Sequence, residues 1–278
     1  MTASTLPVRA GDGHEFALIA LEPASVRQAV LWLPALGVAA RHYLPFAHAL
    51  AARGVAVYLH EWRGHGSSSL RASRRSTWGY RTLLEVDLPA ATDAIRARTT
   101  ATPTLGGHSL GGQLAACHAA LSHAHVAGLW LVGSGSPYWR NFPRPLRYGL
   151  PLAYRFLPWL ATFNGALPGR RLGFGGNEAR GVMHDWSRTA LSGRYAVEGW
   201  DADIEDGLAA LSAPVAAVAL EHDWLAPRSS LEFLLSKMPH APAQVTQLDT
   251  HALQAPADHF AWMRTPDAVA EALTRAAS

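Results

Sequence analysis

The chain has 278 residues, of which 49% are hydrophobic, and it carries 24 basic against 21 acidic residues and one cysteine. This composition excludes an intrinsically disordered chain and a scaffold held together by disulfides. The net charge of +3 is too small and too scattered to indicate a nucleic-acid-binding surface.

The N-terminal residues 1–14 lack a basic start followed by an apolar run. They predict neither a secretory signal nor a mitochondrial presequence, so we expect a cytoplasmic protein. Residues 99–139 contain no Asp, Glu, Lys or Arg, but Gly, Ser, Pro and His interrupt them. Because a membrane span needs about 20 predominantly apolar residues, we expect no membrane span.

The predicted elements begin with a β-hairpin, in which alternating runs at 5–9 and 15–21 flank the turn residues Gly11, Asp12 and Gly13. Beyond it, short apolar runs typical of strands buried on both faces alternate with helical patterns. The predicted strands are 29–33, 55–60, 102–107, 126–132, 214–220 and 243–248. The predicted helices are 43–52, 83–98, 110–122, 229–237 and 266–276. This alternation predicts an α/β fold with a mostly parallel, doubly wound sheet.

Residues 134–200 break the alternation and are rich in Pro, Gly and aromatic residues. We predict that they form a helical lid inserted into a core made of residues 1–133 and 201–278. The lid holds nine arginines against three acidic residues. Two interpretations stay open: the lid meets anionic substrates or a membrane surface, or the arginine stems cover apolar lid surface while their charged ends stay in water.

The pentapeptide Gly107-His108-Ser109-Leu110-Gly111 follows a strand-like run and opens a helix-like run. A serine nucleophile in this pattern occupies a strained strand-to-helix turn, and the glycines remove Cβ atoms that would clash there. The pattern therefore predicts Ser109 as a catalytic nucleophile.

A serine hydroxyl needs a general base oriented by a carboxylate, and in this architecture the chain order is Ser, then Asp or Glu, then His. Asp223 follows the strand predicted at 214–220, at the end of the sheet where functional loops lie. Its rivals are Glu221, Asp249 and the acidic cluster at 201–206. For the base we predict His259, in the loop before the closing helix, with His251 as the alternative.

The negative charge that develops on an attacked carbonyl oxygen needs fixed N–H donors. We expect one from the backbone amide of Leu110 and the other from the loop after the strand at 29–33, where we choose Leu36. Aromatic lid residues suit an acyl or aromatic group, or alternatively pack the lid's own core. From them we take Trp139, Phe142 and Phe156 as substrate-binding candidates.

Together these residues resemble the α/β-hydrolase superfamily, in particular its monoglyceride-lipase-like and serine-aminopeptidase-like branch. Residues 61–67 are similar to the branch's D-x-R-G-H-G-x-S loop, with Glu61 in place of Asp. Residues 136–187 are similar to a bacterial group of α/β-hydrolases with unassigned substrates. The chain departs from the branch in two places: Pro34 and Ala35 replace the usual His-Gly before the first oxyanion donor, and Asp258 replaces the usual Gly before the catalytic histidine.

The sequence thus predicts a serine hydrolase that cleaves a small-molecule carboxylic ester or thioester through an acyl-enzyme, using Ser109, His259 and Asp223. This chemistry requires no metal and no organic cofactor. The sequence leaves open whether the protein forms a homodimer. Two alternatives remain: an acyltransferase that uses the same three residues, and a catalytically silent ligand-binding module, which the altered oxyanion loop motivates.

Overall fold

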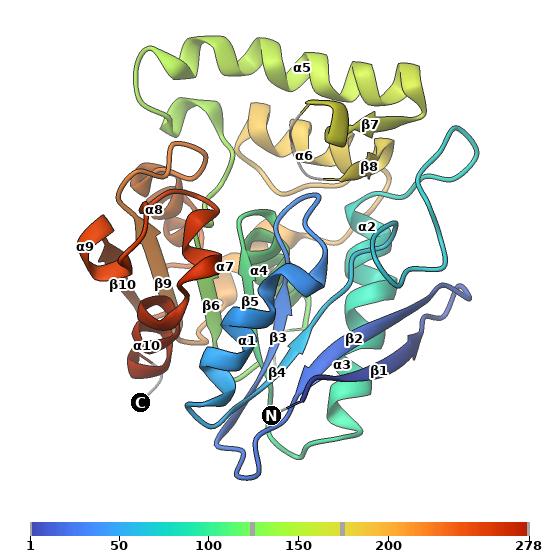
Figure 1. Cartoon of the computed structure of the whole chain (residues 1–278). Coiled ribbons are helices and arrows are strands. Elements are labelled where there is room, and N and C mark those ends of the chain that lie inside the picture. Colours follow the sequence, from blue (N-terminus) through green and yellow to red (C-terminus); the bar gives the residue numbers. More distant parts are fainter. Residues whose placement is uncertain (1, 123–125, 173–175, 277–278) are drawn as a thin grey trace.

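The structure is a computed structural model, and it describes residues 2–122, 126–172 and 176–276. The predicted resemblance over 136–187 therefore falls partly outside the described residues, at 173–175. An eight-stranded sheet, in the order β1-β2-β4-β3-β5-β6-β9-β10, forms the centre of the molecule (Figure 1). Its strands are β1 (Ser4–Arg9), β2 (Glu15–Leu21), β3 (Gln28–Leu33), β4 (Val55–Leu59), β5 (Thr104–His108), β6 (Leu129–Val132), β9 (Val215–Leu220) and β10 (Ala243–Leu248).

The strand directions confirm the predicted α/β architecture. The hairpin β1–β2 is antiparallel and β2 joins β4 antiparallel, whereas every pairing from β4 through to β10 is parallel. The central strands β3, β4, β5, β6 and β9 are almost wholly buried, as expected of strands covered on both faces. The edge strand β10 is mostly exposed or half-buried, which fits its single neighbour.

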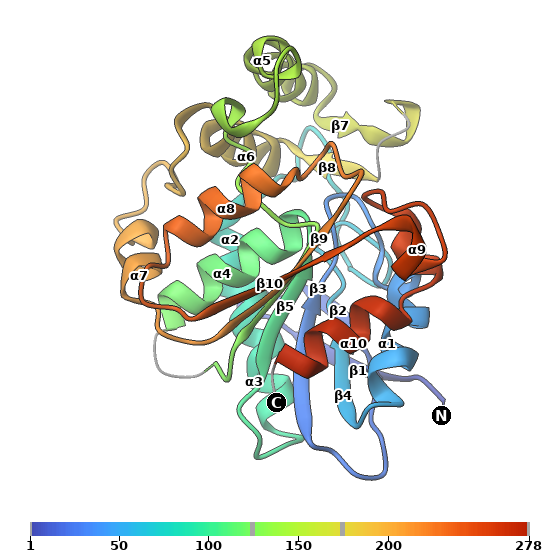
Figure 2. The ribbon, with the colours of Figure 1, turned by 90° about the vertical axis from the view of Figure 1, so that its left-hand side faces the viewer.

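Helices cover both faces of the sheet (Figure 2). Successive side chains of β3 alternate between them: Leu31 and Leu33 join the apolar core on one face, and Val30 and Trp32 join the core on the other. The helices of the core are η1 (Ala40–Tyr43), α1 (Leu44–Ala51), α2 (Tyr80–Thr82), η2 (Leu83–Asp87), α3 (Leu88–Arg96), α4 (Leu110–Ser122), α7 (Ile204–Ala210), α8 (Arg228–Ser236), α9 (Thr250–Leu253), η5 (Ala261–Arg264) and α10 (Asp267–Ala276).

Several predicted boundaries were wrong by a few residues. The helix predicted at 83–98 begins earlier, at Tyr80, and contains a π-helical turn over Leu83–Asp87. The strand predicted at 126–132 begins at Leu129. Element ends depend on tertiary hydrogen bonds more than on local pattern, so such shifts are expected.

Residues between β6 and α7 lie above the carboxyl ends of the parallel strands (Figure 1). Two helices of this insertion, α5 and α6, pack against each other, and a small antiparallel pair of strands lies beside them. The insertion contains η3 (Trp139–Asn141), α5 (Leu146–Asn164), β7 (Ala166–Pro168), η4 (Gly169–Leu172), β8 (Asn177–Ala179) and α6 (Arg180–Ser192). Its role as a lid, and the division of the chain at 134 and 200, stay predictions.

The helix α5 lies at the outer edge of the molecule (Figure 1), and one of its faces exposes large apolar side chains. Their spacing of three and four residues places them on one side of the helix. The exposed side chains are Tyr148, Leu152, Phe156, Trp159 and Phe163. These aromatic residues therefore do not form the buried core of the insertion.

Candidate active site

Ser109 occupies the turn between β5 and α4. Its φ of 55° lies in the left-handed region, which is strained for a residue with a side chain. Two hydrogen bonds hold the turn: the Ser109 amide donates to the carbonyl of Val132 at 3.1 Å, and the Ser134 hydroxyl donates to the carbonyl of Ser109 at 3.0 Å. The serine is partly exposed, in the strand-turn-helix setting that the G-x-S-x-G pattern requires.

The glycines around Ser109 are required by close backbone contacts. A Cβ on Gly107 would lie 2.3 Å from the carbonyl carbon of Gly111, and a Cβ on Gly111 would lie 2.0 Å from the carbonyl oxygen of Leu33. Both distances are far below van der Waals contact. The second contact also shows that the start of α4 lies directly against the loop that follows β3.

Asp223 and His259, which are 36 residues apart, form a buried pair. His259 Nδ1 lies 2.7 Å from Asp223 Oδ2, while Asp223 Oδ1 accepts hydrogen bonds from the amides of Leu225 and Ala226 at 3.0 and 2.8 Å. Both side chains are almost inaccessible to water. Because an ionised carboxylate only accepts hydrogen bonds, Nδ1 carries the proton and Nε2 is left as the acceptor.

The rival acids have other partners. Glu221 is exposed beside His222. Asp249 caps α9 by accepting from the amide of Ala252, and Asp203 caps α7 in the same way. The rival base His251 is an exposed residue of α9. Of the predicted acids and bases, the structure brings together Asp223 and His259.

Asp258 fixes the loop that carries His259. Its carboxylate accepts hydrogen bonds from the amides of Phe260 and Ala261 at 2.9 and 2.8 Å. The indole N–H of Trp262 donates to the carbonyl of His259 at 3.1 Å. The aspartate therefore closes a turn of the backbone just after the histidine.

The two predicted oxyanion donors line one small cavity of about 10 Å³. Within the described part of the chain, the amides of Leu36 and Leu110 donate to no acceptor. The flanking loop is nevertheless anchored, since Trp62 Nε1 donates to the carbonyl of Pro34 and the Ala35 amide donates to the Tyr43 hydroxyl, both at 2.9 Å. Free amides on an anchored loop are what a developing negative charge needs.

Tyr43 is a site residue that sequence reasoning missed. Its buried hydroxyl accepts from the Ala35 amide and lies 2.8 Å from Nδ1 of His108, the residue before the serine. Burial lowers the pKa of His108 well below its usual value, and the nearby His259 acts in the same direction. A neutral His108 ring accepts the one proton of the hydroxyl, so Tyr43 connects the oxyanion loop to the serine turn. No local sequence pattern predicts that a tyrosine will make these two contacts.

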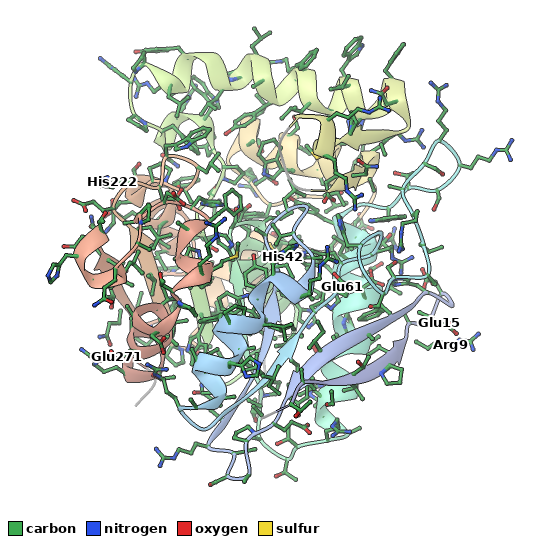
Figure 3. All side chains as sticks on the ribbon, viewed as in Figure 1. Arg9, Glu15, His42, Glu61, His222 and Glu271 are labelled. Atoms are coloured by element: carbon green, nitrogen blue, oxygen red, sulfur yellow. The ribbon has the colours of Figure 1, made fainter. Side chains whose placement is uncertain are left out.

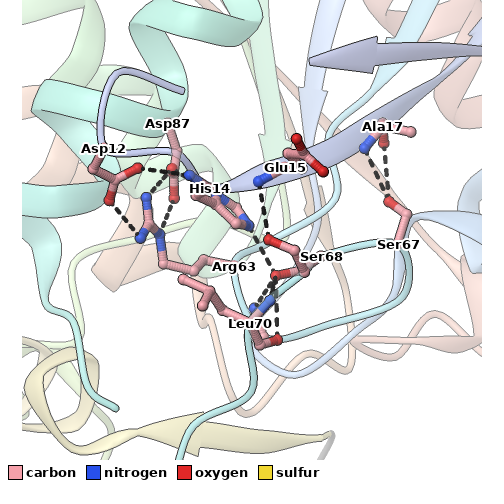
Figure 4. A network of polar contacts seen from close by, with 11 residues as sticks. Asp12, His14, Glu15, Ala17, Arg63, Ser67, Ser68, Leu70 and Asp87 are labelled. Carbon is pink, nitrogen blue, oxygen red and sulfur yellow. Dashed lines mark hydrogen bonds and ion pairs between the residues drawn. The ribbon is translucent and has the colours of Figure 1, made fainter. Parts of the chain in front are cut away.

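The loop at 61–68 is held by a buried ion-pair network (Figure 4). Arg63 donates twice to Asp87, at 2.9 and 2.6 Å, and once to Asp12 at 2.7 Å, while His14 bridges Asp87 and Ser68. Burial opposes the charge of Asp87, but the hydrogen bonds from Arg63 and His14 outweigh it and lower the pKa of Asp87. The network fixes this loop to the hairpin and to η2.

The same loop also contacts the insertion. His65 Nε2 lies 2.9 Å from Glu178 of β8, and both side chains are buried. Burial alone would lower the pKa of His65, but the hydrogen bond and charge of Glu178, together with the charge of Glu61, raise it. Glu61 itself accepts from the amide of Ala40 at 3.1 Å. The insertion and the oxyanion side of the site are thus joined by a buried pair that the sequence did not single out.

The three substrate-binding candidates occupy different environments. Phe142 is buried next to η3, and Trp139 is half-buried with the guanidinium of Arg140 5.1 Å from its ring. Phe156 lies on the exposed face of α5, stacked on Trp159 at 5.6 Å. Their role in substrate binding stays a prediction.

Over residues 2–122, 126–172 and 176–276, no group of three or more His, Cys, Asp or Glu side chains is arranged to hold a metal ion. No helix in the same ranges has the length and apolar character needed to cross a bilayer.

Comparison with known structures gives the same fold. The esterase domain of a Rhodothermus marinus protein is 19% identical and has a TM-score of 0.64, covering 100% of this chain and 97% of that one. Carboxylesterases of Nitrososphaera gargenis (15%, TM-score 0.65, 95% and 94% covered) and the thioesterase domain of the curacin pathway (16%, TM-score 0.61, 100% of each) are also similar. At these identities the likeness shows the α/β-hydrolase fold.

The sequence comparisons are consistent with this fold. No curated protein sequence matches the chain. The profile of the family described as serine aminopeptidase, S33, matches residues 24–253, which include the serine turn, Asp223 and the whole insertion. The chain therefore belongs to the serine aminopeptidase S33 family of α/β hydrolases.

Proposed function

We propose that the protein is a serine hydrolase that cleaves a carboxylic ester or thioester through an acyl-enzyme. The observation that carries the proposal is the buried contact of His259 Nδ1 with Asp223 Oδ2, in a chain whose Ser109 occupies a strained, glycine-framed turn. These are the three chemical groups that nucleophilic catalysis by a hydroxyl requires.

In the proposed reaction, His259 Nε2 accepts the proton of the Ser109 hydroxyl as its oxygen attacks the carbonyl carbon. Asp223 holds the ring and stabilises the imidazolium that forms. The amides of Leu36 and Leu110 bind the oxyanion. The imidazolium then protonates the departing alcohol or thiol, and a water molecule activated by the same histidine releases the acid.

The insertion supports the proposal through its position. It lies above the carboxyl ends of the strands that carry Ser109 and Asp223 (Figure 1), and it is joined to the loop at 61–68 by the His65–Glu178 pair. We therefore assign residues 134–200 the role of a lid that shields the acyl-enzyme from bulk water.

A fluorophosphonate probe tests the assignment of the nucleophile. Wild-type protein should be labelled on Ser109, located by peptide mass spectrometry, and Ser109→Ala should not be labelled. The control is Ser236→Ala, an exposed serine at the end of α8, which should be labelled like the wild type. Hydrolysis of p-nitrophenyl butyrate should disappear in parallel with labelling. Equal labelling of Ser109→Ala and wild type would refute the proposal.

A further inference from the structure

A hollow of about 850 Å³ is lined by residues that adjoin the proposed catalytic residues in the chain. Its wall includes Gly37, which follows the oxyanion donor Leu36, and Phe260, which follows His259. His42 also lines it, and this side chain lies below the insertion near the middle of the molecule in Figure 3. A group bound there would belong to a substrate whose scissile carbonyl reaches the serine.

Among the described residues that line this hollow, the ionisable side chains are arginine and histidine, with no aspartate or glutamate. Arg41 comes from η1, Arg71 from the loop after β4, and Arg170 from the insertion. A second hollow of about 500 Å³ shares Arg170, Ala72 and Asn177 with the first, and its described lining adds Arg74 and Arg171, again without an acidic residue. Five arginines from three segments therefore surround two adjoining hollows.

These arginine charges are not neutralised by the described part of the chain, in which none of the five forms an ion pair with a carboxylate. Arg71 instead donates to the carbonyls of Gly66, Ser68 and Leu70, and Arg74 donates to a carbonyl of α5. Carboxylates near the first hollow have other partners, since Glu178 pairs with His65 and Glu61 accepts from an amide. By contrast, Arg63, Arg98 and Arg188 each pair with an acidic side chain.

We propose that the two hollows bind a phosphate-bearing portion of the substrate whose acyl group is cleaved at Ser109. The inference rests on the proposed function and names its substrate class. Guanidinium groups bind phosphate oxygens through paired, charge-assisted hydrogen bonds, and several arginines converging on one space favour more than one negative charge. The combined space is larger than one phosphate needs and suits a ligand of nucleotide size.

Two kinds of ester combine a cleavable acyl group with phosphate: an acyl thioester of coenzyme A and an acyl ester of glycerol phosphate. The test uses the full chain and two matched substrate pairs. Butyryl-CoA is compared with butyryl-pantetheine, which lacks the phosphates, and 1-acylglycerol 3-phosphate below its critical micelle concentration is compared with the monoacylglycerol of the same chain length. In each pair the acyl group and the bond cleaved are the same.

We expect KM for the phosphate-bearing member of one pair to be at least about tenfold lower than for its neutral partner, since tenfold corresponds to one charge-assisted hydrogen bond. In the double variant Arg41→Gln/Arg170→Gln this preference should fall towards one. Both guanidinium groups lack a hydrogen-bond partner in the described part of the chain, so the fold does not depend on them. Arg9→Gln, on the edge strand β1 away from the hollow (Figure 3), is the matched control and should keep the preference.

The outcomes distinguish a coenzyme A thioester from a glycerol phosphate ester, and they separate failure of the phosphate-binding inference from failure of the proposed hydrolase function. A preference in the coenzyme A pair alone identifies a thioester, and a preference in the glycerol pair alone identifies a phospholipid-type ester. Equal KM values within both pairs, with Ser109 still labelled by the fluorophosphonate, overturn the inference and leave the proposed function standing. If no ester is hydrolysed, titration calorimetry with coenzyme A and with glycerol 3-phosphate still tests whether the hollows bind a phosphate-bearing ligand. Binding that the double variant loses supports the inference, and the absence of binding overturns it.

Discussion

Replacing Tyr43 by phenylalanine should weaken both the fold and the proposed activity. The substitution keeps the buried ring and removes only the hydroxyl, which accepts from the Ala35 amide at 2.9 Å and contacts His108 Nδ1 at 2.8 Å. Each buried group left without a partner costs about 1–3 kcal/mol, so the two together should lower the free energy of unfolding by about 2–6 kcal/mol. Because Ala35 precedes Leu36, the oxyanion loop should also lose its anchor, and kcat/KM should fall about tenfold, less than the loss of a whole donor.

Tyr80→Phe provides a matched control for this measurement. Tyr80 is as buried as Tyr43, but its hydroxyl has no hydrogen-bond partner among the described residues. Removing it should leave stability unchanged or slightly raised, and kcat/KM unchanged. Urea unfolding followed by circular dichroism and hydrolysis of p-nitrophenyl butyrate measure the two quantities. If Tyr43→Phe changes stability by less than about 0.5 kcal/mol and kcat/KM by less than about twofold, Tyr43 does not anchor the oxyanion loop.

Further predictions concern the serine turn, a buried histidine and the exposed helix. Gly111→Ala should destabilise the fold by about 3 kcal/mol, because the added Cβ would lie 2.0 Å from a backbone oxygen. A Cβ added at Gly149 on α5 would contact no other atom within 4 Å, so Gly149→Ala should be neutral or stabilising in urea unfolding. Burial lowers the pKa of His60 to about 4, against a smaller opposing effect of Asp87. The unfolded chain therefore binds more protons between pH 6.5 and 4, and stability should fall on acidification, by about 2 kcal/mol from this group between pH 6.5 and 5. Leu152→Ser, at 75% exposure, should change the free energy of unfolding by less than about 0.5 kcal/mol and should reduce binding of an apolar dye.

Each of these expectations has an outcome that contradicts it. Equal unfolding free energies for Gly111→Ala and Gly149→Ala would mean that the backbone contact yields easily. His60→Leu should flatten the acid dependence of stability, so an unchanged slope would assign that dependence to other groups. A loss of several kcal/mol on Leu152→Ser would show that this side chain is covered in solution.

Much of the fold follows from local pattern. The continuous apolar runs at 55–59 and 215–220 become strands buried on both faces, and the alternation of 15–21 becomes an antiparallel hairpin strand. These predictions succeeded because side-chain burial repeats with the period of the element itself. The ends of elements, such as the start of β6, were less well predicted because they depend on neighbouring strands.

The sequence suggests candidate site residues where the chemistry fixes their order and spacing. A serine between closely spaced glycines marks its own turn, and the order of acid and base in the chain narrows the remaining choice. The contact between Asp223 and His259 spans 36 residues, yet it could be anticipated because both follow strands at the same end of the sheet. The substrate-binding candidates had no such constraint, and Phe156 lies on the outer face of α5.

By itself, the sequence determined the α/β class and the glycine-framed turn at Ser109, and it predicted Asp223 and His259 as the acid and base, because each rests on residues near one another in the chain or on a fixed order of strands. Only the tertiary structure decided that Tyr43 joins the Ala35 amide to His108, that Glu178 of the insertion pairs with His65, and that arginines from three segments surround one hollow. Apart from Ala35 and Tyr43, which are eight positions apart, those contacts join residues separated by tens of positions. No periodicity encodes them, since they arise when packed strands and helices bring distant side chains together.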